Sequence, residues 1–222
     1  MKLEIACFSL ESALIAHENL ADRIELCSDF KSGGLTPDYQ MAKSSRTKIS
    51  CDLYVMIRPR SGDFVYTAKE FEQMKKDIQF FKKIEADGFV FGILNKDGTV
   101  NMSQNKRLVS LAAPLPCTFH RAFDSTPNPQ KALADIISCG FSTVLTSGQA
   151  KTALQGVELI SKLASIAKKK ITVMPGGGIR SNNIASIVQK VSTTYCHSSA
   201  IVNESNLPSI KEIQLLRKNM RE

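Results

Sequence analysis

The sequence predicts a single α/β domain over residues 1–222, in which eight parallel strands and the helices between them close into a (β/α)8 barrel. Eight short apolar stretches alternate with helical patterns, and this alternation is typical of a parallel sheet. Most steps between the stretches are close to the roughly 30 residues of a βα unit. Several stretches end in polar or glycine residues, as expected at the end of a barrel that carries chemistry. An open doubly wound sheet is the alternative, and eight units favour the closed barrel.

The early units of this barrel are predicted to be abbreviated, because the chain is shorter than the ~250 residues typical of such folds. Apolar and β-branched residues predict strands at residues 3–7, 22–27 and 52–57. Apolar residues at helical spacing predict a helix at 9–19, and a weaker pattern predicts one at 38–46. The segment 31–37 is expected to be a loop, because it contains two adjacent glycines and a proline.

The later units show clearer boundaries. After a loop at 58–66, Thr67 and Glu70 form a capping box that starts a long amphipathic helix. Asn128 and Pro129 are suited to the cap and the first turn of another helix. The remaining strands are predicted at 87–91, 116–119, 142–146, 171–174 and 194–198. The remaining helices are predicted near 102–112, 129–138, 152–167 and 181–190, with a last one from Pro208.

Composition is that of an ordinary water-soluble protein, with 43% hydrophobic and 23% charged residues. The net charge of +8 comes from scattered Lys and Arg without interleaved aromatic residues, which favours solvated faces or attraction of anionic metabolites over a nucleic-acid surface. No signal peptide or membrane-length apolar stretch is recognised, so we expect no membrane partner. Six cysteines without a C-x-x-C pair or zinc-finger spacing predict the reducing cytoplasm.

The segment 119–124 places an imidazole, a guanidinium and a carboxylate where a short strand ends. We expect His120 to be a general acid or base, tuned by Asp124 or Glu25, so these three residues are the catalytic candidates. The alternatives are that His120 is a hydrogen-bonded wall residue, and that Glu25 forms a satisfied buried network with Glu4 and the arginines.

An anion site is predicted at the ends of the last two strands. Glycines allow close approach of backbone N–H groups, the helix start at Ser181 favours anions, and barrels often bind phosphate here. Arginine adds bidentate recognition of carboxylate or phosphate. The anion-binding candidates are Arg58, Arg60, Arg121, Gly176, Gly177, Gly178 and Ser199. The alternatives are a tight turn at the glycines and structural ion pairs of the arginines with Glu4, Glu25 or Asp63.

Cys27 is the candidate metal ligand, because it ends a strand at the barrel mouth beside Glu25. Cys7 and Cys196 end neighbouring strands, and thiolates and thioethers select Cu(I). Single cysteines on separate strands are otherwise apolar filler.

At these residues the sequence resembles the CutC family, the so-called copper homeostasis proteins. The matching motifs cover nearly the whole chain, at 21–27, 33–37, 56–60, 62–66, 87–92, 119–124, 144–148, 174–179 and 197–200. The resemblance implies a TIM-like barrel, often incomplete, in a cytosolic and commonly homo-oligomeric protein that binds Cu(I), with Cys27 matching a proposed ligand. Ser61 and Leu20 stand where the family usually has glycine, and Ile201 stands where it commonly has an arginine, which would remove an anion contact.

Two main hypotheses follow. One is a cytosolic copper-homeostasis protein that binds Cu(I) through Cys27 and another thiol. The other is a barrel enzyme that acts on a small anionic or phosphorylated metabolite by acid/base chemistry at His120, Glu25 and Asp124. A nucleic-acid binder, the third hypothesis, depends on net charge alone.

Overall fold

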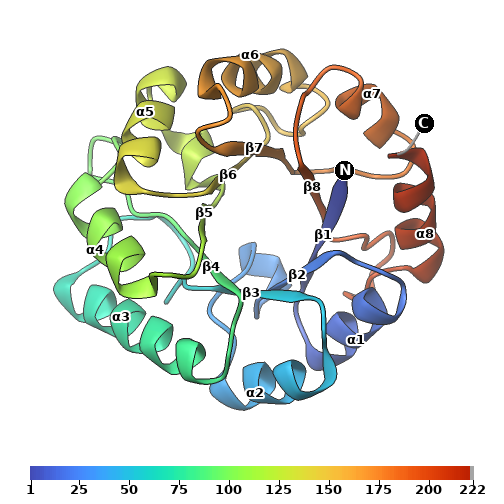
Figure 1. The fold of residues 1–222 in the computed structure, drawn as a ribbon, viewed down its shortest axis with the longest axis horizontal. Helices are drawn as coiled ribbons and strands as arrows, with labels where there is room; N and C mark the ends of the chain where they lie inside the picture. Colours follow the sequence, from blue (N-terminus) through green and yellow to red (C-terminus); the bar gives the residue numbers. More distant parts are fainter. Residues whose placement is uncertain (221–222) are drawn as a thin grey trace.

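A computed structural model describes residues 1–220, and within them eight parallel strands form a ring surrounded by helices (Figure 1). Each strand is short and lies within one residue or so of its predicted position. The strands are β1 (Lys2–Cys7), β2 (Arg23–Leu26), β3 (Asp52–Met56), β4 (Gly88–Phe91), β5 (Cys117–Phe119), β6 (Thr143–Thr146), β7 (Thr172–Pro175) and β8 (Tyr195–Ser198). The predicted α/β fold with eight alternating units is therefore confirmed, and it is a TIM-like barrel.

The strand order in the sheet is β7-β6-β5-β4-β3-β2-β1-β8, so that the first and last strands of the chain are paired. Among residues 1–220 no ladder joins β7 to β8, and the barrel is nearly closed rather than fully hydrogen bonded. This seam is held by side chains: the Thr193 hydroxyl donates to the Val173 carbonyl at 2.8 Å, and Leu145, Met174 and Tyr195 pack together. The expected incompleteness therefore lies at the last two strands.

The helices cover the outside of the ring (Figure 1). They are α1 (Leu10–Glu18), α2 (Tyr39–Lys48), α3 (Ala68–Lys83), α4 (Met102–Ala112), α5 (Pro129–Cys139), α6 (Val157–Ala167), α7 (Ile184–Val188) and α8 (Ile210–Asn219), with 3-10 turns η1 (Phe30–Ser32) and η2 (Arg121–Ser125). The capping box is confirmed, because Glu70 N–H donates to Thr67 Oγ1 and Thr67 N–H donates to Glu70 Oε2. None of these helices is both long and apolar enough to cross a membrane.

Two helices begin later than predicted. The helix expected from residue 152 begins at Val157, because Gly148 and Gly156 touch so closely that a Cβ on either would clash with the other's backbone. The helix expected at 181–190 contains only Ile184–Val188. Its expected start is tied to α8 instead: Ser181 donates its N–H and hydroxyl to the two carboxylate oxygens of Glu212, at 2.6 and 2.8 Å. The predicted helical anion site at Ser181 is therefore wrong, because a carboxylate occupies it.

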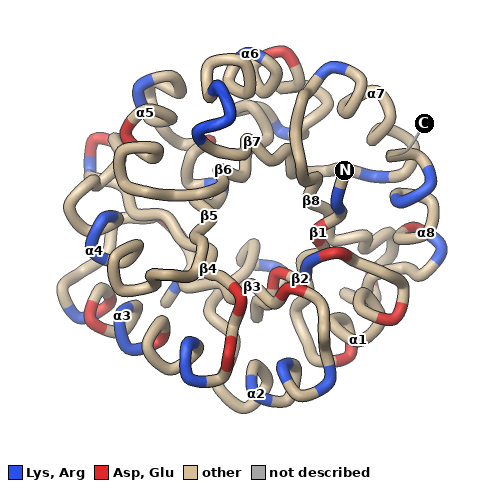
Figure 2. Tube along the Cα trace, in the orientation of Figure 1, with Lys and Arg blue, Asp and Glu red and all other residues tan. Residues whose placement is uncertain are grey.

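Side chains alternate along each strand, and the two faces have different chemistry. Outward residues such as Ile5 and Leu53 pack under the helices in the main apolar core. Inward positions at β1, β2 and β8 carry several charged side chains, among them Glu4, Glu25 and His197. Lys and Arg elsewhere are distributed over the helices around the whole ring (Figure 2). The barrel interior, rather than one outer face, therefore concentrates the unusual charges.

Candidate active site

A cavity of about 290 Å³ lies at the carboxyl ends of the strands. It brings together seven of the residues expected from the sequence, namely Glu25, Arg58, Arg121, His120, Gly177, Gly178 and Ser199. Its lining also includes His197 and Arg180, which the sequence analysis did not select, and three aromatic residues, Phe8, Phe30 and Phe64. The other four expected residues, Arg60, Asp124, Gly176 and Cys27, are not part of this lining.

Arg58 is buried, with 7% of its surface exposed, and it lines the cavity. Its two terminal nitrogens donate to the carbonyl oxygens of Ser32, Gly34 and Gly62, rather than to a carboxylate. Its Nε atom is buried and has no hydrogen-bond partner within residues 1–220. Because carbonyls orient a guanidinium without neutralising it, Arg58 gives the cavity a fixed positive charge.

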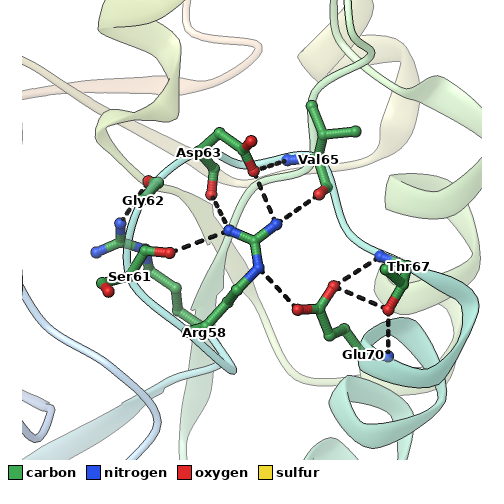
Figure 3. A network of polar contacts seen from close by, with 8 residues as sticks. Arg58, Ser61, Gly62, Asp63, Val65, Thr67 and Glu70 are labelled. Carbon is green, nitrogen blue, oxygen red and sulfur yellow. Dashed lines mark hydrogen bonds and ion pairs between the residues drawn. The ribbon is translucent and has the colours of Figure 1, made fainter.

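Arg60 does not reach the cavity with Arg58. Its Nε donates to Glu70 at 2.7 Å, and one terminal nitrogen donates to the Asp63 carboxylate at 2.8 Å and to the Val65 carbonyl at 2.7 Å. Figure 3 labels these partners, Asp63, Val65 and Glu70, and shows the Thr67 capping box beside Glu70. The structure thus uses Arg60 to tie the loop after β3 to the start of α3.

Asp124 is also engaged away from His120. Its carboxylate accepts from Arg121 Nε at 2.8 Å, from the Thr146 hydroxyl at 2.5 Å and from the backbone N–H groups of Ser147 and Gln149. These contacts join η2 to the loop after β6. Asp124 therefore holds Arg121 in place, and Arg121 also donates to Ser147 Oγ at 2.8 Å.

His120 is buried, and the lack of a Cβ at Gly92 makes room for its ring. Its Nδ1 accepts from the N–H of Ala122 at 3.3 Å, which assigns the proton of the neutral ring to Nε2. That Nε2 has no partner among the described residues. Burial and the charge of Arg58 lower the pKa of His120 to about 3. His120 is therefore a neutral hydrogen-bond donor at physiological pH, and the expected acid/base titration near neutrality does not fit this environment.

The acid/base geometry lies instead at Glu4, His197 and Glu25. His197 Nδ1 lies 2.7 Å from Glu4 Oε1, and His197 Nε2 lies 3.9 Å from Glu25 Oε2. Gly176 lets His197 lie close to the end of β7, since a Cβ at position 176 would lie only 3.2 Å from the Cβ of His197. Burial raises the pKa of Glu25 to about 7. The charge of His197 acts to lower this pKa, and the charge of Glu4 acts to raise it. Glu25 Oε1 is buried and has no protein partner within residues 1–220.

Arg23 supports this group from beneath. Its guanidinium lies between the rings of Tyr54 and Tyr195, 3.8 Å from each ring centre, and donates to Glu4 Oε2 at 3.1 Å. Burial would raise the pKa of Glu4, but the hydrogen bonds and charges of His197 and Arg23 outweigh it and lower that pKa. Burial would lower the pKa of His197, but Glu25 and Glu4 outweigh it and raise that pKa. Glu4 is thus a fixed carboxylate that orients the histidine.

The end of β7 and β8 forms a polar wall. Gly177 and Gly178 have φ values of +97° and +71°, which favour glycine, and both line the cavity. Among residues 1–220 their N–H groups have no hydrogen-bond acceptor. Arg180 lies beside them and donates to the carbonyls of Ile179 and Ile201, both at 2.7 Å. Arg180 therefore supplies a cation beside the glycine motif, close to Ile201.

Two groups could hold a metal ion. Glu4, Glu25 and His197 place three ligand atoms within 4.8 Å of one another, but both oxygens of Glu4 and the Nδ1 of His197 are already hydrogen bonded. Cys27 is fully buried and lies 3.6 Å from Glu25 Oε2, and burial and the Glu25 charge raise its pKa well above the ordinary value. Cys7 points to the other side of the sheet, where its thiol donates to the Ser12 carbonyl. The two thiols therefore do not converge.

His197 and Arg180 could have been selected from the sequence. His197 is the next-to-last residue of β8, directly before Ser198 and Ser199, and its period-2 position places it on the inner face. Arg180 follows the glycine motif by two residues. The role of Glu4 has no local signal, because its partner His197 is 193 residues away.

Comparison with known proteins identifies the relatives of this chain. The sequence model of the CutC family matches residues 1–202. The human copper homeostasis protein cutC homolog is 44% identical over 198 residues, which cover 89% of this chain and 72% of that protein. A CutC family protein of Chromobacterium violaceum is 41% identical, with 89% and 80% covered.

Solved structures agree with this assignment. The putative copper homeostasis protein CutC of Streptococcus agalactiae superposes with a TM-score of 0.84 at 29% identity, covering 90% of this chain and 98% of that one. Thiamine phosphate pyrophosphorylase of Pyrococcus furiosus superposes with a TM-score of 0.67 at 16% identity, covering 99% and 95%, which is a likeness of fold alone.

Proposed function

The chain belongs to the CutC family of copper homeostasis proteins, and from that premise we propose that it acts on a small anionic metabolite by proton transfer at Glu25 and His197. One observation carries the proposal: the cavity contains a carboxyl group whose pKa is near 7 beside a histidine that is oriented by a second carboxylate. A base whose pKa lies near the working pH is ionised in a large fraction of molecules and is still basic enough to take a proton. Two carboxylates in different electrostatic environments can then take different roles.

The charge of the cavity supports an anionic ligand. Arg58 and Arg180 line it and are held by carbonyl oxygens rather than by carboxylates. The N–H groups of Gly177 and Gly178 and the hydroxyl of Ser199 add neutral donors at the β7–β8 end. Such fixed donors suit a phosphate or carboxylate oxygen, since they already line the cavity and an anion can bind them without any rearrangement of the protein.

Each residue then has a defined part in the reaction. Ionised Glu25 takes a proton from the ligand through its unpartnered Oε1, and protonated His197 returns a proton from Nε2. His120 donates its Nε2 hydrogen to a ligand oxygen on which negative charge develops, and it keeps that proton because its pKa is low. Arg121, held by Asp124, and Arg58 attract the anion. His120 is thus a donor in this scheme rather than the base expected from the sequence.

A two-stage experiment tests this proposal. Phosphorylated and carboxylated metabolites are screened by thermal shift, and each binder is incubated with protein in D₂O while its C–H signals are followed by NMR. We expect a binder to exchange a C–H proton with solvent, and Glu25→Gln to slow that exchange at least about 100-fold. Exchange that persists in Glu25→Gln, or a complete screen without any binder, overturns the proposal.

A second candidate function is Cu(I) binding, and one contact favours it. A Cβ on Gly34 would lie 3.2 Å from the Cys27 sulfur and 3.6 Å from the terminal methyl of Met56, so a thiol and a thioether flank the same point. This donor set fits Cu(I) by its softness. It ranks second because the buried thiol, with its raised pKa, must lose a proton beside Glu25 before it can bind the ion.

We place this activity in the cytoplasm. All six cysteines are free thiols, including buried Cys27, Cys117 and Cys139. A reducing compartment keeps thiols in this state.

A further inference from the structure

We infer that the ligand of this cavity joins its anionic group to an aromatic ring, and that Phe8 and Phe30 form the subsite for that ring. The inference rests on the proposed function and names the substrate class of the same site: a small phosphate or carboxylate that carries an aromatic ring in addition to the C–H group from which Glu25 takes a proton. It follows from the unequal chemistry of the two sides of the cavity, the size of the cavity and the position of this aromatic pair.

The aromatic pair lies on the loops after β1 and β2. Phe8 follows the last residue of β1, and Phe30 begins the 3-10 turn η1 after β2. Their ring centres are 5.0 Å apart at an interplanar angle of 69°, an edge-to-face arrangement. Phe30 keeps 37% of its surface exposed, and both rings line the cavity. The pair therefore presents apolar surface that a ligand can cover.

The third aromatic residue of the lining, Phe64, is engaged differently. Its ring lies 4.9 Å from the centre of His120, and the Arg58 guanidinium lies 4.9 Å from its own centre. It serves as a wall for two polar groups on the β3 and β5 side. This leaves Phe8 and Phe30 as the aromatic surface beside β1 and β2.

The pair adjoins the proposed anion cradle around the rim. β8 is hydrogen bonded to β1, and β1 is hydrogen bonded to β2, so the Ser199 end of the cradle is next to the Phe8 loop. Glu25 and His197 come from β2 and β8 and flank the strand between them. A ligand that spans cradle and aromatic pair therefore passes the two proton-transfer groups.

The size of the cavity fits such a ligand. Its volume of 290 Å³ lies at the lower end of the roughly 300–1,000 Å³ range of small-molecule pockets, so it holds more than a phosphate group alone. The rest of the space is bounded in part by apolar side chains. A ring that buries roughly 60 Å² of apolar surface there would bind about tenfold tighter than a ligand without it.

Isothermal titration with two simple probes tests the inference. Phenyl phosphate and ethyl phosphate carry the same anionic group and differ in the ring. We expect phenyl phosphate to bind the wild type about tenfold more tightly than ethyl phosphate, and Phe30→Ala to reduce this ratio to about two or less. Phe80→Ala is the matched control, because Phe80 stacks on Tyr39 between outer helices and should keep the tenfold ratio.

The outcomes separate this inference from the proposed function. Equal affinity of the two probes in the wild type, or an unchanged ratio in Phe30→Ala, overturns the aromatic subsite and leaves the anion site standing. Failure of both probes to bind overturns the anion site itself, and the subsite with it. A readout without mutation is also available: intermolecular NOEs from the phenyl protons to the Phe8 and Phe30 rings are expected in the wild type, and NOEs to other aromatic rings alone would place the ligand elsewhere.

Discussion

His197 Nδ1 and Glu4 Oε1 lie 2.7 Å apart, on residues that are direct partners in the ladder between the last and first strands of the barrel. The contact turns the other nitrogen of the imidazole toward Glu25. Arg23 pairs with the second oxygen of Glu4, so the carboxylate that orients His197 is itself held in a buried ion pair. The pairing of β1 with β8 therefore does two things: it nearly completes the barrel, and it builds the acid/base group.

Replacing Glu4 with Gln should lower the pKa of His197, since the amide removes one of the two carboxylates that raise it. NMR titration of the imidazole signals measures this shift. The change also removes the closer of the two carboxylates paired with buried Arg23 and leaves only Asp52, at 3.9 Å, which we expect to cost up to about 3–5 kcal/mol in urea unfolding. An unchanged His197 titration in a folded Glu4→Gln protein would contradict the orienting role of Glu4.

Glu25 should make the protein less stable as pH rises from about 4.5 to 7. Its pKa in the folded state is about 7, above the value of an unfolded glutamate, so in this interval the folded state retains a proton that the unfolded state has lost. Glu25→Gln removes that difference, and the variant should lose less stability than the wild type between pH 5 and pH 8. Urea unfolding at both pH values measures it, and parallel losses in the two proteins would refute the raised pKa.

His120 should make the protein more stable as pH rises, which is the opposite of the effect of Glu25. With its pKa lowered to about 3, the folded state excludes a proton that the unfolded state binds below pH 6.5, so stability from this group rises with pH between about 3 and 6.5. His120→Asn should flatten the acid limb of the stability profile by a few kcal/mol, on the order of 1.4 per pH unit. If the variant keeps the wild-type acid limb, His120 is not held neutral by burial and Arg58.

Arg60 should affect stability but not the affinity for anions. Arg60→Lys loses the fork that joins Asp63, Val65 and Glu70, and because the side chain is about one third exposed we expect a loss of only about 1 kcal/mol. Arg58→Lys is the contrasting variant, since Arg58 lines the cavity. Phosphate titration should show weaker binding for Arg58→Lys and unchanged binding for Arg60→Lys. An equal loss in both would place Arg60 at the ligand.

The sequence predicted the fold almost completely, because each βα unit carries its own local signals. The Thr67 capping box and the Asn128–Pro129 helix start depend on residues three apart or closer, and both form as expected. The helix expected from Ser181 begins only at Ile184, after a turn in which the Arg180 carbonyl accepts from the N–H groups of Asn183 and Ile184. Glu212, 31 residues later, holds the Ser181 N–H and hydroxyl, and no local pattern predicts such a distant contact.

The candidate site was predictable in its members but not in their pairing. Strand-end positions placed His120, Arg121 and Gly177 at the barrel mouth, and all three line the cavity. Which groups touch depends on strand register: Asp124 pairs with the loop after β6 instead of His120, and Glu4 pairs with His197 across the closing ladder. Register also separates the thiols, since Cys7 and Cys27 face opposite sides of the sheet.

Cu(I) binding through Cys27 should depend strongly on pH. Anaerobic competition titration of the wild type is expected to give one Cu(I) site, lost in Cys27→Ser and weakened in Met56→Leu, whose thioether faces the same point. Because the buried thiol is protonated in the free protein, each bound ion displaces one proton, and the apparent Kd should rise about tenfold for each pH unit lowered. Cys51→Ser is the control, as Cys51 immediately precedes β3 and does not line the cavity. Equal Cu(I) affinity of the wild type, Cys27→Ser and Cys51→Ser would contradict a copper site at Cys27. An anionic metabolite would then be the one ligand proposed for the positively charged cavity.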